Sequence, residues 1–237
     1  FMVKLLKLHL LCDGFFTLDK SFMVYMKYMG QPYHAALKPL LISTPQDNIL
    51  VDTGIGELPE KYQKFFPVKR KTEENLKTQL AQHSLKPEDI DIVVNTHLHF
   101  DHCGNNSLFE NAKFVIQKDE FRYASAPDKF QHTAYIKELF DIRTDHVLVN
   151  GRHQVTNDVF VVRTPGHTIG HQSVIVRTDD KNYVYCGDAA PTKENLERRN
   201  IPGVLYCSHK ALGSLDKLTQ VKNAYYIYSH DNQQLQL

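Results

Sequence analysis

The sequence predicts an α/β fold in which two mixed β-sheets pack face to face and helices cover their outer faces (αββα). The 237-residue chain is 42% hydrophobic, which is enough for one substantial core. Short apolar runs bounded by turn residues predominate, and such runs indicate strands. A block of strands followed by a helix occurs twice in chain order, as in layered sheets flanked by helices. Because no low-complexity linker interrupts the sequence, we expect a single domain over residues 1–237.

The first half of the chain is expected to contribute strands and one long helix. The strands are expected at residues 3–11, 40–43, 48–52, 90–94 and 113–117. A Pro-Gln-Asp turn joins the second and third of them into a hairpin. Thr72 is the expected N-cap of the helix, with Glu73 and Glu74 in its first turn, where carboxylates suit the positive end of the helix dipole. Leu76 and Leu80 give this helix its apolar face.

The second half is expected to repeat the pattern. Helices are expected at residues 118–125, 129–140 and 211–222. Strands are expected at residues 146–149, 159–163, 172–177, 183–186 and 224–229. The final strand leads directly to His230.

The composition limits the expected partners and compartment. The net charge of +1 gives no overall field that would hold nucleic acid. The densest basic run, at 69–71, is expected to be solvated. The four cysteines form no C-x-x-C pair, which indicates reduced thiols in a cytoplasmic protein. The apolar stretch at 1–11 is broken by Lys4 and Lys7, so neither a signal peptide nor a membrane helix is expected.

The segment at 97–102 (HLHFDH) carries the strongest chemical signal. Directly after a predicted strand it offers four potential metal ligands: His97, His99, Asp101 and His102. His97 and His99 are two residues apart, so on extended backbone they point the same way, whereas the later pair can face a second metal. Imidazole and carboxylate suit Zn, Fe, Co or Mn, zinc first, and the lack of thiolates favours a catalytic site. The alternative, a polar surface loop, is common for a single histidine but not for this pattern.

This segment resembles the signature of the metallo-β-lactamase superfamily. Four other segments are similar to further parts of that pattern and come in the same order: 51–54 (VDTG), 164–171 (TPGHTIGH), 185–188 (YCGD) and 228–231 (YSHD). The resemblance covers nearly the whole chain. It implies the αββα fold and a hydrolase with two divalent metal ions per chain.

The same resemblance implies roles for individual residues. The ligands of one metal would be His97, His99 and His167. The ligands of the other would be Asp101, His102 and His230, with Asp188 bridging the two metals. Asp52 and His171 would orient the ligands through hydrogen bonds. His171 could equally be an ordinary buried histidine.

The chemistry implied by such a site is hydrolysis. A hydroxide shared by two cations is a nucleophile at neutral pH, because the metals lower the pKa of water from about 16 to about 7. The expected catalytic carboxylates are Asp101 and Asp188. Asp101 would take the proton and return it to the leaving alkoxide, while Asp188 would hold both metals.

The flanking residues resemble the N-acyl-homoserine lactonases, which open a five-membered lactone and thereby silence quorum signals. The similar segments are 97–106, 164–173, 187–190 and 192–195 (TKEN). One position departs from that family, which commonly has a tyrosine three residues after the bridging aspartate, at the substrate carbonyl. This chain has Pro191 there, and proline has no donor. Tyr25, Tyr28 and Tyr33 are the candidates to replace it.

A lactone with an acyl chain needs an apolar wall. The segment at 22–29 (FMVYMKYM) is rich in aromatic residues and methionine, and Phe65 and Phe66 follow the VDTG turn. The expected substrate contacts are Met23, Met26, Phe65, Phe66 and Phe100. The alternative is that these side chains form core or subunit contacts, as in a homodimer.

Three rival functions follow from the same residues. The first is a metal-dependent esterase, thioesterase or phosphodiesterase of the same fold. The second is a di-iron redox protein, which would normally need an electron-transfer partner or a flavin domain that we do not expect here. The third is a metal-binding module without activity, which the complete ligand set disfavours.

Overall fold

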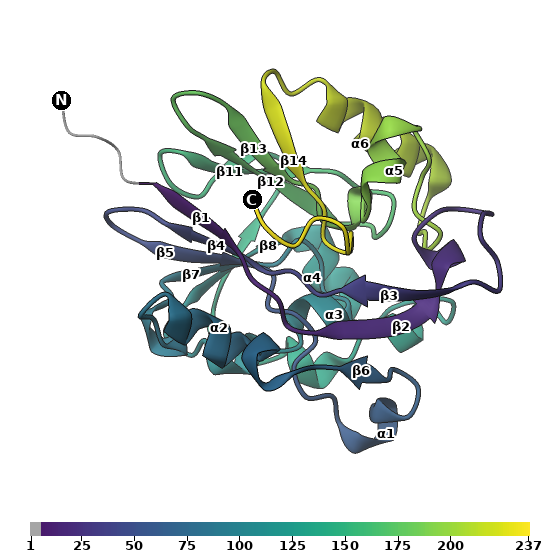
Figure 1. Cartoon of the computed structure of the whole chain (residues 1–237), viewed down its shortest axis with the longest axis horizontal. Helices are drawn as coiled ribbons and strands as arrows, with labels where there is room; N and C mark the ends of the chain where they lie inside the picture. Colours follow the sequence, from purple (N-terminus) through teal and green to yellow (C-terminus); the bar gives the residue numbers. More distant parts are fainter. Residues whose placement is uncertain (1–5) are drawn as a thin grey trace.

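Two mixed β-sheets form the centre of the computed structural model, which describes residues 6–237 (Figure 1). The six-stranded sheet contains, in spatial order, β1 (Lys7–Leu10), β4 (Leu40–Ser43), β5 (Asn48–Val51), β7 (Ile92–Val94), β8 (Lys113–Gln117) and β9 (Asp145–Val149). The five-stranded sheet contains β10 (His153–Gln154), β11 (Val159–Arg163), β12 (Gln172–Arg177), β13 (Asn182–Tyr185) and β14 (Ala224–Ile227). Each sheet combines parallel and antiparallel pairs: β5, β7, β8 and β9 run parallel to one another, as do β13 and β14.

Alternate residues of the strands build the core between the sheets. Leu40 and Ile42 of β4 belong to the same buried cluster as Val174 and Val176 of β12. The intervening Leu41 belongs to a separate cluster on the outer face of the first sheet. This period of two is what a strand covered on both faces requires.

Helices cover the outer face of each sheet, which confirms the predicted αββα sandwich. On the first sheet these are α2 (Leu76–Gln82) and α4 (Lys118–Ser125). On the second they are α5 (Lys193–Glu197) and α6 (Ser208–Thr219), whose leucines pack against Val184 of β13. The short helices α1 (Glu60–Gln63) and α3 (Phe100–Cys103) precede β6 and follow β7, respectively.

A third, smaller sheet was not expected from the sequence. It has the order β3-β2-β6 and contains β2 (Phe15–Asp19), β3 (Pro32–Ala36) and β6 (Val68–Lys69). Only Phe16 of β2 is buried, and β6 has two residues, so neither strand has the apolar alternation by which strands are recognised. Phe16 and Leu18 of this sheet line the cavity described below.

Three predicted helices differ from the observed ones. Residues 129–140 form two short 3-10 turns, His132–Ala134 and Lys137–Leu139, instead of a helix. Tyr135 and Ile136 between them are extended, which sends these neighbours into two different hydrophobic clusters. Extended backbone points adjacent side chains to opposite sides, which a helix does not do.

The other two helices differ at their ends. The N-cap of α2 is Asn75, whose side chain accepts a hydrogen bond from the Lys77 amide at 3.0 Å, while the predicted cap Thr72 begins a separate 3-10 turn. The last helix, α6, begins and ends three residues before the predicted span of 211–222. The predicted first strand is observed from Lys7, and its first residues, 3–5, lie outside the described part.

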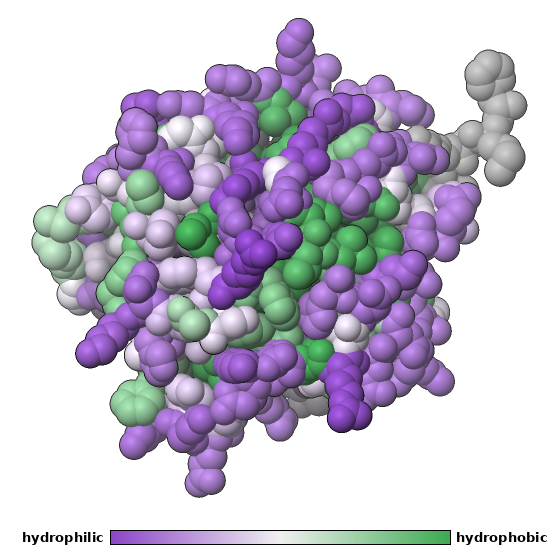
Figure 2. Space-filling model, turned by 180° about the vertical axis from the view of Figure 1, so that it is seen from behind, coloured by the Kyte–Doolittle hydropathy of each residue, from purple (hydrophilic) through white to green (hydrophobic). Residues whose placement is uncertain are grey.

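Hydrophobic side chains are exposed on the connection between β2 and β3. In the view from behind, pale-green side chains protrude at the edge of the molecule where this connection runs (Figure 2). Met26 and Met29 are 66% and 68% exposed there. Within residues 6–237 no helix is long and apolar enough to cross a membrane.

Candidate metal centre

The predicted ligands come together at one end of the two central sheets. Each group follows a strand: His97, His99 and α3 follow β7, His167 follows β11, Asp188 follows β13, and His230 follows β14. Strands β11, β13 and β14 run in the same direction, so their carboxyl ends meet at one edge. A strand end also lets the backbone turn, which allows neighbouring side chains such as Asp101 and His102 to point inward from α3.

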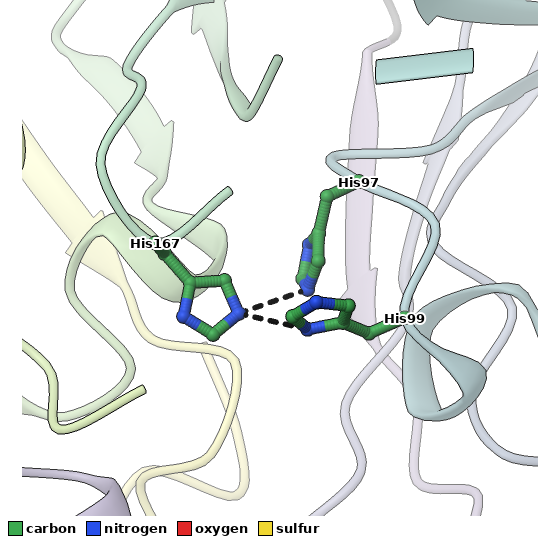
Figure 3. A group of neighbouring side chains, drawn as sticks. All are labelled: His97, His99 and His167. Carbon is green, nitrogen blue, oxygen red and sulfur yellow. Dashed lines mark hydrogen bonds between the residues drawn. The ribbon is translucent and has the colours of Figure 1, made fainter. Parts of the chain in front are cut away.

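The first ligand group consists of three histidines whose rings converge (Figure 3). The Nε2 atom of His167 lies 3.2 Å from Nε2 of His97 and 3.0 Å from Nδ1 of His99. His97 and His99 come from one side of the site and His167 from the other. Burial, followed by the neighbouring histidines, holds the pKa of His97 and of His99 well below the usual range. Both rings are therefore neutral, as metal ligands must be.

The second group consists of Asp101, His102 and His230. The Nε2 atoms of His102 and His230 lie 3.1 Å apart, and Asp101 Oδ2 is 3.7 Å and 3.5 Å from them. Burial disfavours charge on His102, but the carboxylates of Asp188 and Asp52 outweigh it and raise the pKa of His102 well above its usual value. The site therefore attracts positive charge at this position.

Asp188 faces both groups. Its Oδ1 lies 3.3 Å from Nε2 of both His102 and His230, and its Oδ2 lies 3.4 Å from Nε2 of His167. Burial favours the neutral acid, yet His230, His102 and His167 lower the pKa of Asp188 well below its usual value. One ionised carboxylate thus spans the two histidine groups, which is the arrangement that a bridging ligand requires.

The outer nitrogens of the imidazole rings show that the cluster fits metal ions. The Nδ1 atoms of His167 and His230 each lie 2.8 Å from a backbone carbonyl, to which they donate. His102 Nδ1 is 2.8 Å from Asp52 Oδ2, and His97 Nδ1 is 3.0 Å from Oγ1 of Thr96. Each of these contacts fixes the proton on the outer nitrogen and leaves the Nε2 lone pair directed at the centre. The facing Nε2 atoms of His102 and His230 lie 3.1 Å apart, and those of His97 and His167 lie 3.2 Å apart. A cation, whether a proton or a metal ion, is therefore needed between the two nitrogens of each pair.

Asp52 and His171 are both in contact with the cluster. Asp52 accepts from the Thr96 amide at 2.7 Å and the Thr96 hydroxyl at 2.8 Å, in addition to His102. His171 Nε2 accepts from the Asp188 amide at 2.9 Å, and burial lowers the pKa of His171 to about 3. A Cβ on Gly187 would lie 2.7 Å from that Nε2, so a glycine is required beside it. His171 therefore positions the backbone of Asp188.

Glu120 is a buried carboxylate that the sequence did not reveal. Its Oε1 accepts from the Leu98 amide (3.1 Å) and the Tyr135 hydroxyl (3.0 Å). Its Oε2 accepts from the Thr168 hydroxyl (2.7 Å) and the Gly170 amide (2.9 Å). Glu120 therefore joins the loop that carries His97 and His99 to the loop that carries His167. A glutamate in the first turn of a helix is common because of the helix dipole, so its sequence carried no specific signal.

The cluster forms the floor of a cavity of about 360 Å³ with mainly apolar walls. Of the expected substrate contacts, Met23, Phe65, Phe66 and Phe100 line it. Met26 was predicted to do so but does not, because its backbone turns through the left-handed region (φ 56°) and its side chain points to solvent. Phe22, from the same aromatic and Met-rich segment, also lines the cavity. Further wall residues, not expected from the sequence, include Phe16, Leu18, Phe130, Gln131 and Val204.

None of the tyrosines considered as replacements at Pro191 lines the cavity. Tyr33 donates to the backbone carbonyl of His230 at 3.0 Å, and burial raises the pKa of Tyr33 to about 12. Tyr28 donates to the Glu194 carboxylate at 3.0 Å. Tyr25 is half exposed on the surface. Within the described residues, the cavity wall therefore offers no phenol hydroxyl to a substrate carbonyl.

Known proteins share the sequence pattern and the fold. The family model described as the metallo-β-lactamase superfamily matches residues 40–230. An N-acyl homoserine lactonase of Bacillus cereus is 30% identical over 241 residues, covering 96% of this chain and 94% of the relative. An N-acyl homoserine lactonase of Rhizobium radiobacter is 30% identical over 206 residues, covering 80% and 78%. A solved N-acyl homoserine lactone hydrolase superposes with a TM-score of 0.85 at 27% identity, covering 96% of this chain and 94% of the other. The chain therefore belongs to the metallo-β-lactamase superfamily, among the metal-dependent hydrolases related to the N-acyl homoserine lactonases.

Proposed function

We propose that this protein opens the lactone ring of N-acyl homoserine lactones with two divalent metal ions, of which zinc is the first choice. The observation that carries the proposal is Asp188, whose two oxygens face two histidine groups at the floor of an apolar cavity. The relatives of Bacillus cereus and Rhizobium radiobacter are lactonases of this kind. The solved hydrolase holds N-hexanoyl-L-homoserine, the ring-opened product, at its catalytic metal centre.

The proposed ligands divide into two sets. One metal would be held by His97, His99 and His167, and the other by Asp101, His102 and His230, with Asp188 available to both. The distances and tautomers described above support this division. The seven proposed ligand residues combine imidazole nitrogens with carboxylate oxygens, a set that suits Zn and also accepts Fe, Co or Mn.

When bound, the two metals would lower the pKa of water and polarise the ester carbonyl. The proton transfers of the reaction are carried out by a side chain of the protein. Asp101 lines the cavity and takes the proton of the attacking water on a carboxylate oxygen. The new bond forms between the water oxygen and the carbonyl carbon, and the ring C–O bond breaks. Asp101 then returns its proton to the leaving alkoxide, which becomes the alcohol. The second proton of the water stays on the new carboxylic acid and is released to solvent when that acid ionises.

The cavity walls favour an uncharged substrate with an acyl chain. Phe66 and Phe100 pack with ring centroids 4.1 Å apart, and Phe16 meets Phe100 edge to face at 6.2 Å. Among the described residues that line the cavity there is no lysine or arginine. The wall therefore offers a charged substrate such as a phosphodiester no cation beyond the metals themselves, and its apolar surface suits neutral lactones and other carboxylic esters better.

We also propose that the protein works in the cytoplasm and that the exposed methionines of the β2–β3 connection contribute to a homodimer. Two observations support these points. Cys103 and Cys186 are buried and free, as expected for a reducing compartment. Met26 and Met29 expose most of their surface on one connection.

The proposed function can be tested with metal-loaded protein and a panel of substrates. The panel contains acyl-homoserine lactones of several chain lengths, a simple γ-lactone, a thioester, a phosphodiester and a β-lactam, and metal content is measured in parallel. We expect two metal equivalents per chain and the highest kcat/KM for an acyl-homoserine lactone. Lactone turnover at background level beside strong turnover of another class would overturn the substrate assignment. Fewer than two bound metals in an active protein would overturn the two-metal assignment.

A further inference from the structure

Gln131 is a buried polar side chain in the wall of the cavity. It is 3% exposed and lies in the turn that precedes His132–Ala134, where its backbone amide donates to the Asp128 carbonyl at 3.0 Å. Its Nε2 donates to the backbone carbonyl of His167 at 3.3 Å. Its Oε1 is buried and has no hydrogen-bond partner within the described residues.

The orientation of this side-chain amide follows from its neighbour. If the amide were turned over, Oε1 would face the carbonyl oxygen of His167, and two acceptors would meet. The observed orientation makes the bond to His167 and leaves the oxygen as a spare acceptor. A buried acceptor without a donor is costly, so this oxygen is a place where a bound molecule can donate.

The donor that fits is a neutral N–H. The cavity is mainly apolar, so an ammonium group would lose its hydration there without a carboxylate partner beside Gln131. An N-acyl homoserine lactone has a single N–H, on the carbon next to the ring carbonyl. Gln131 contacts the backbone of His167, and both residues line the cavity, so a substrate whose ring carbonyl is at the histidine cluster would bring the neighbouring amide into the part of the cavity that Gln131 lines.

We infer that Gln131 accepts the amide N–H of the bound substrate through Oε1 and makes the site prefer lactones with an α-acylamino group. The inference rests on the proposed lactonase function and deepens it. Gln131 is a specificity residue in this assignment, because it touches the substrate away from the bond that breaks. Its Nε2 keeps the Oε1 in place by its bond to the His167 carbonyl.

The test compares two substrates that differ at one atom. The first is N-hexanoyl-homoserine lactone, and the second is its O-acyl analogue, in which an ester oxygen replaces the N–H. Ring opening is followed by mass spectrometry, so cleavage of the side ester is counted separately. For the wild-type protein we expect kcat/KM to be about tenfold higher with the N-acyl substrate, because the analogue leaves Oε1 buried without a donor. Equal kcat/KM for the two substrates would overturn the inference.

Gln131→Met provides the second arm, because methionine has similar length and no strong acceptor. We expect this variant to have a kcat/KM for the N-acyl lactone about tenfold lower than that of the wild-type protein. Its kcat/KM for the O-acyl analogue should stay within about twofold of the wild-type value. His132→Gln is the matched control, since His132 is exposed on the same turn and lies outside the cavity wall; both substrates should be unaffected. If Gln131 only supported the loop of His167, Gln131→Met would reduce both substrates equally and lower the metal content, which would overturn the inference.

A binding measurement separates this inference from the proposed function. The ring-opened products of both substrates are titrated calorimetrically into the metal-loaded wild-type protein, which requires no turnover. Tighter binding of the N-acyl product, by about tenfold, supports the role of Gln131 even if lactone turnover is absent. Equal affinity for the two products overturns the inference. It does not affect the proposed lactonase function, which the substrate panel tests independently.

Discussion

The metal cluster and the walls of the cavity differ in how firmly the fold holds them. Every proposed metal ligand is less than 9% exposed, and the outer nitrogens of most rings donate to fixed oxygens. In the walls, by contrast, Phe22, Phe65 and Phe130 are 50%, 64% and 64% exposed. The cluster is built on the ends of core strands, whereas these three exposed wall residues lie outside the two central sheets, on segments between strands. Variants of the cluster should therefore change metal binding and turnover, whereas variants of the walls should change which substrates are preferred.

The largest effect is expected from Asp188→Asn. This change keeps the shape of the side chain but removes the negative charge that faces both histidine groups. We expect metal content to fall below two equivalents per chain and kcat/KM to fall by about a thousandfold or more. Metal analysis and lactone kinetics check this. Asp180→Asn, at an exposed turn, is the control, and full activity of Asp188→Asn would refute the bridging role.

A smaller effect is expected from Glu120→Gln. The amide would place a donor against the hydroxyl of Thr168 or one of the backbone amides, so at least one buried donor loses its acceptor. We expect the free energy of unfolding to fall by about 2 kcal/mol and metal affinity to fall about tenfold. Denaturant titration and competition with a chelator measure the two quantities. Glu110→Gln, which is exposed, should change neither, and unchanged metal affinity in Glu120→Gln would show that the strands alone hold the two loops.

The sequence predicted the cluster better than the walls for a physical reason. Each ligand closely follows an apolar strand, as His97 and His99 follow β7. The ligand residues and the hydrophobic pattern that reveals the strand are therefore found in the same short segment of sequence. The αββα arrangement followed from the same periodicities. The wall residue Phe16 lies on a strand with no clear alternation, and it became part of the cavity only through pairing with distant β3 and β6.

Gln131 and Glu120 show the second limit of the sequence. Gln131 lies in a segment whose pattern predicted a helix, whereas long-range burial of Tyr135 and Ile136 breaks it into turns. In the sequence Glu120 looks like any acidic residue at the start of a helix. Its role is visible only in the folded structure, where it contacts the loops of His97 and His167. Both residues form hydrogen bonds with backbone groups of segments far away in the chain, such as Gly170 and His167. Because residues of every type have polar backbone groups, the sequence does not indicate which backbone groups a side chain will contact.

The walls can be tested with Phe66→Ala. Phe66 packs on Phe100, and removing its ring takes apolar contact from a bound acyl chain. We expect kcat/KM to fall about tenfold for long-chain acyl lactones and much less for short-chain ones, with metal content unchanged. Met26→Ala is the matched control, because Met26 is exposed and outside the cavity, and it should leave the chain-length profile as it is. An equal loss for all chain lengths would mean that Phe66 supports Phe100 rather than the substrate.

The smallest effect, a gain, is expected from Pro191→Tyr. Pro191 is buried, and its backbone carbonyl accepts from the His230 amide at 2.9 Å, a bond that the substitution keeps. No tyrosine lines the cavity within the described residues. We expect the longer side chain of tyrosine, three residues after Asp188, to bring a phenol hydroxyl toward the substrate carbonyl, which proline cannot do. We expect kcat for acyl-homoserine lactones to rise by about three- to tenfold, measured by steady-state kinetics. Pro191→Phe supplies the same ring without the hydroxyl and should not raise kcat. Equal kcat in the two variants would mean that the cavity already provides a donor for the developing oxyanion, and that the departure at Pro191 reflects packing rather than a missing catalytic contact.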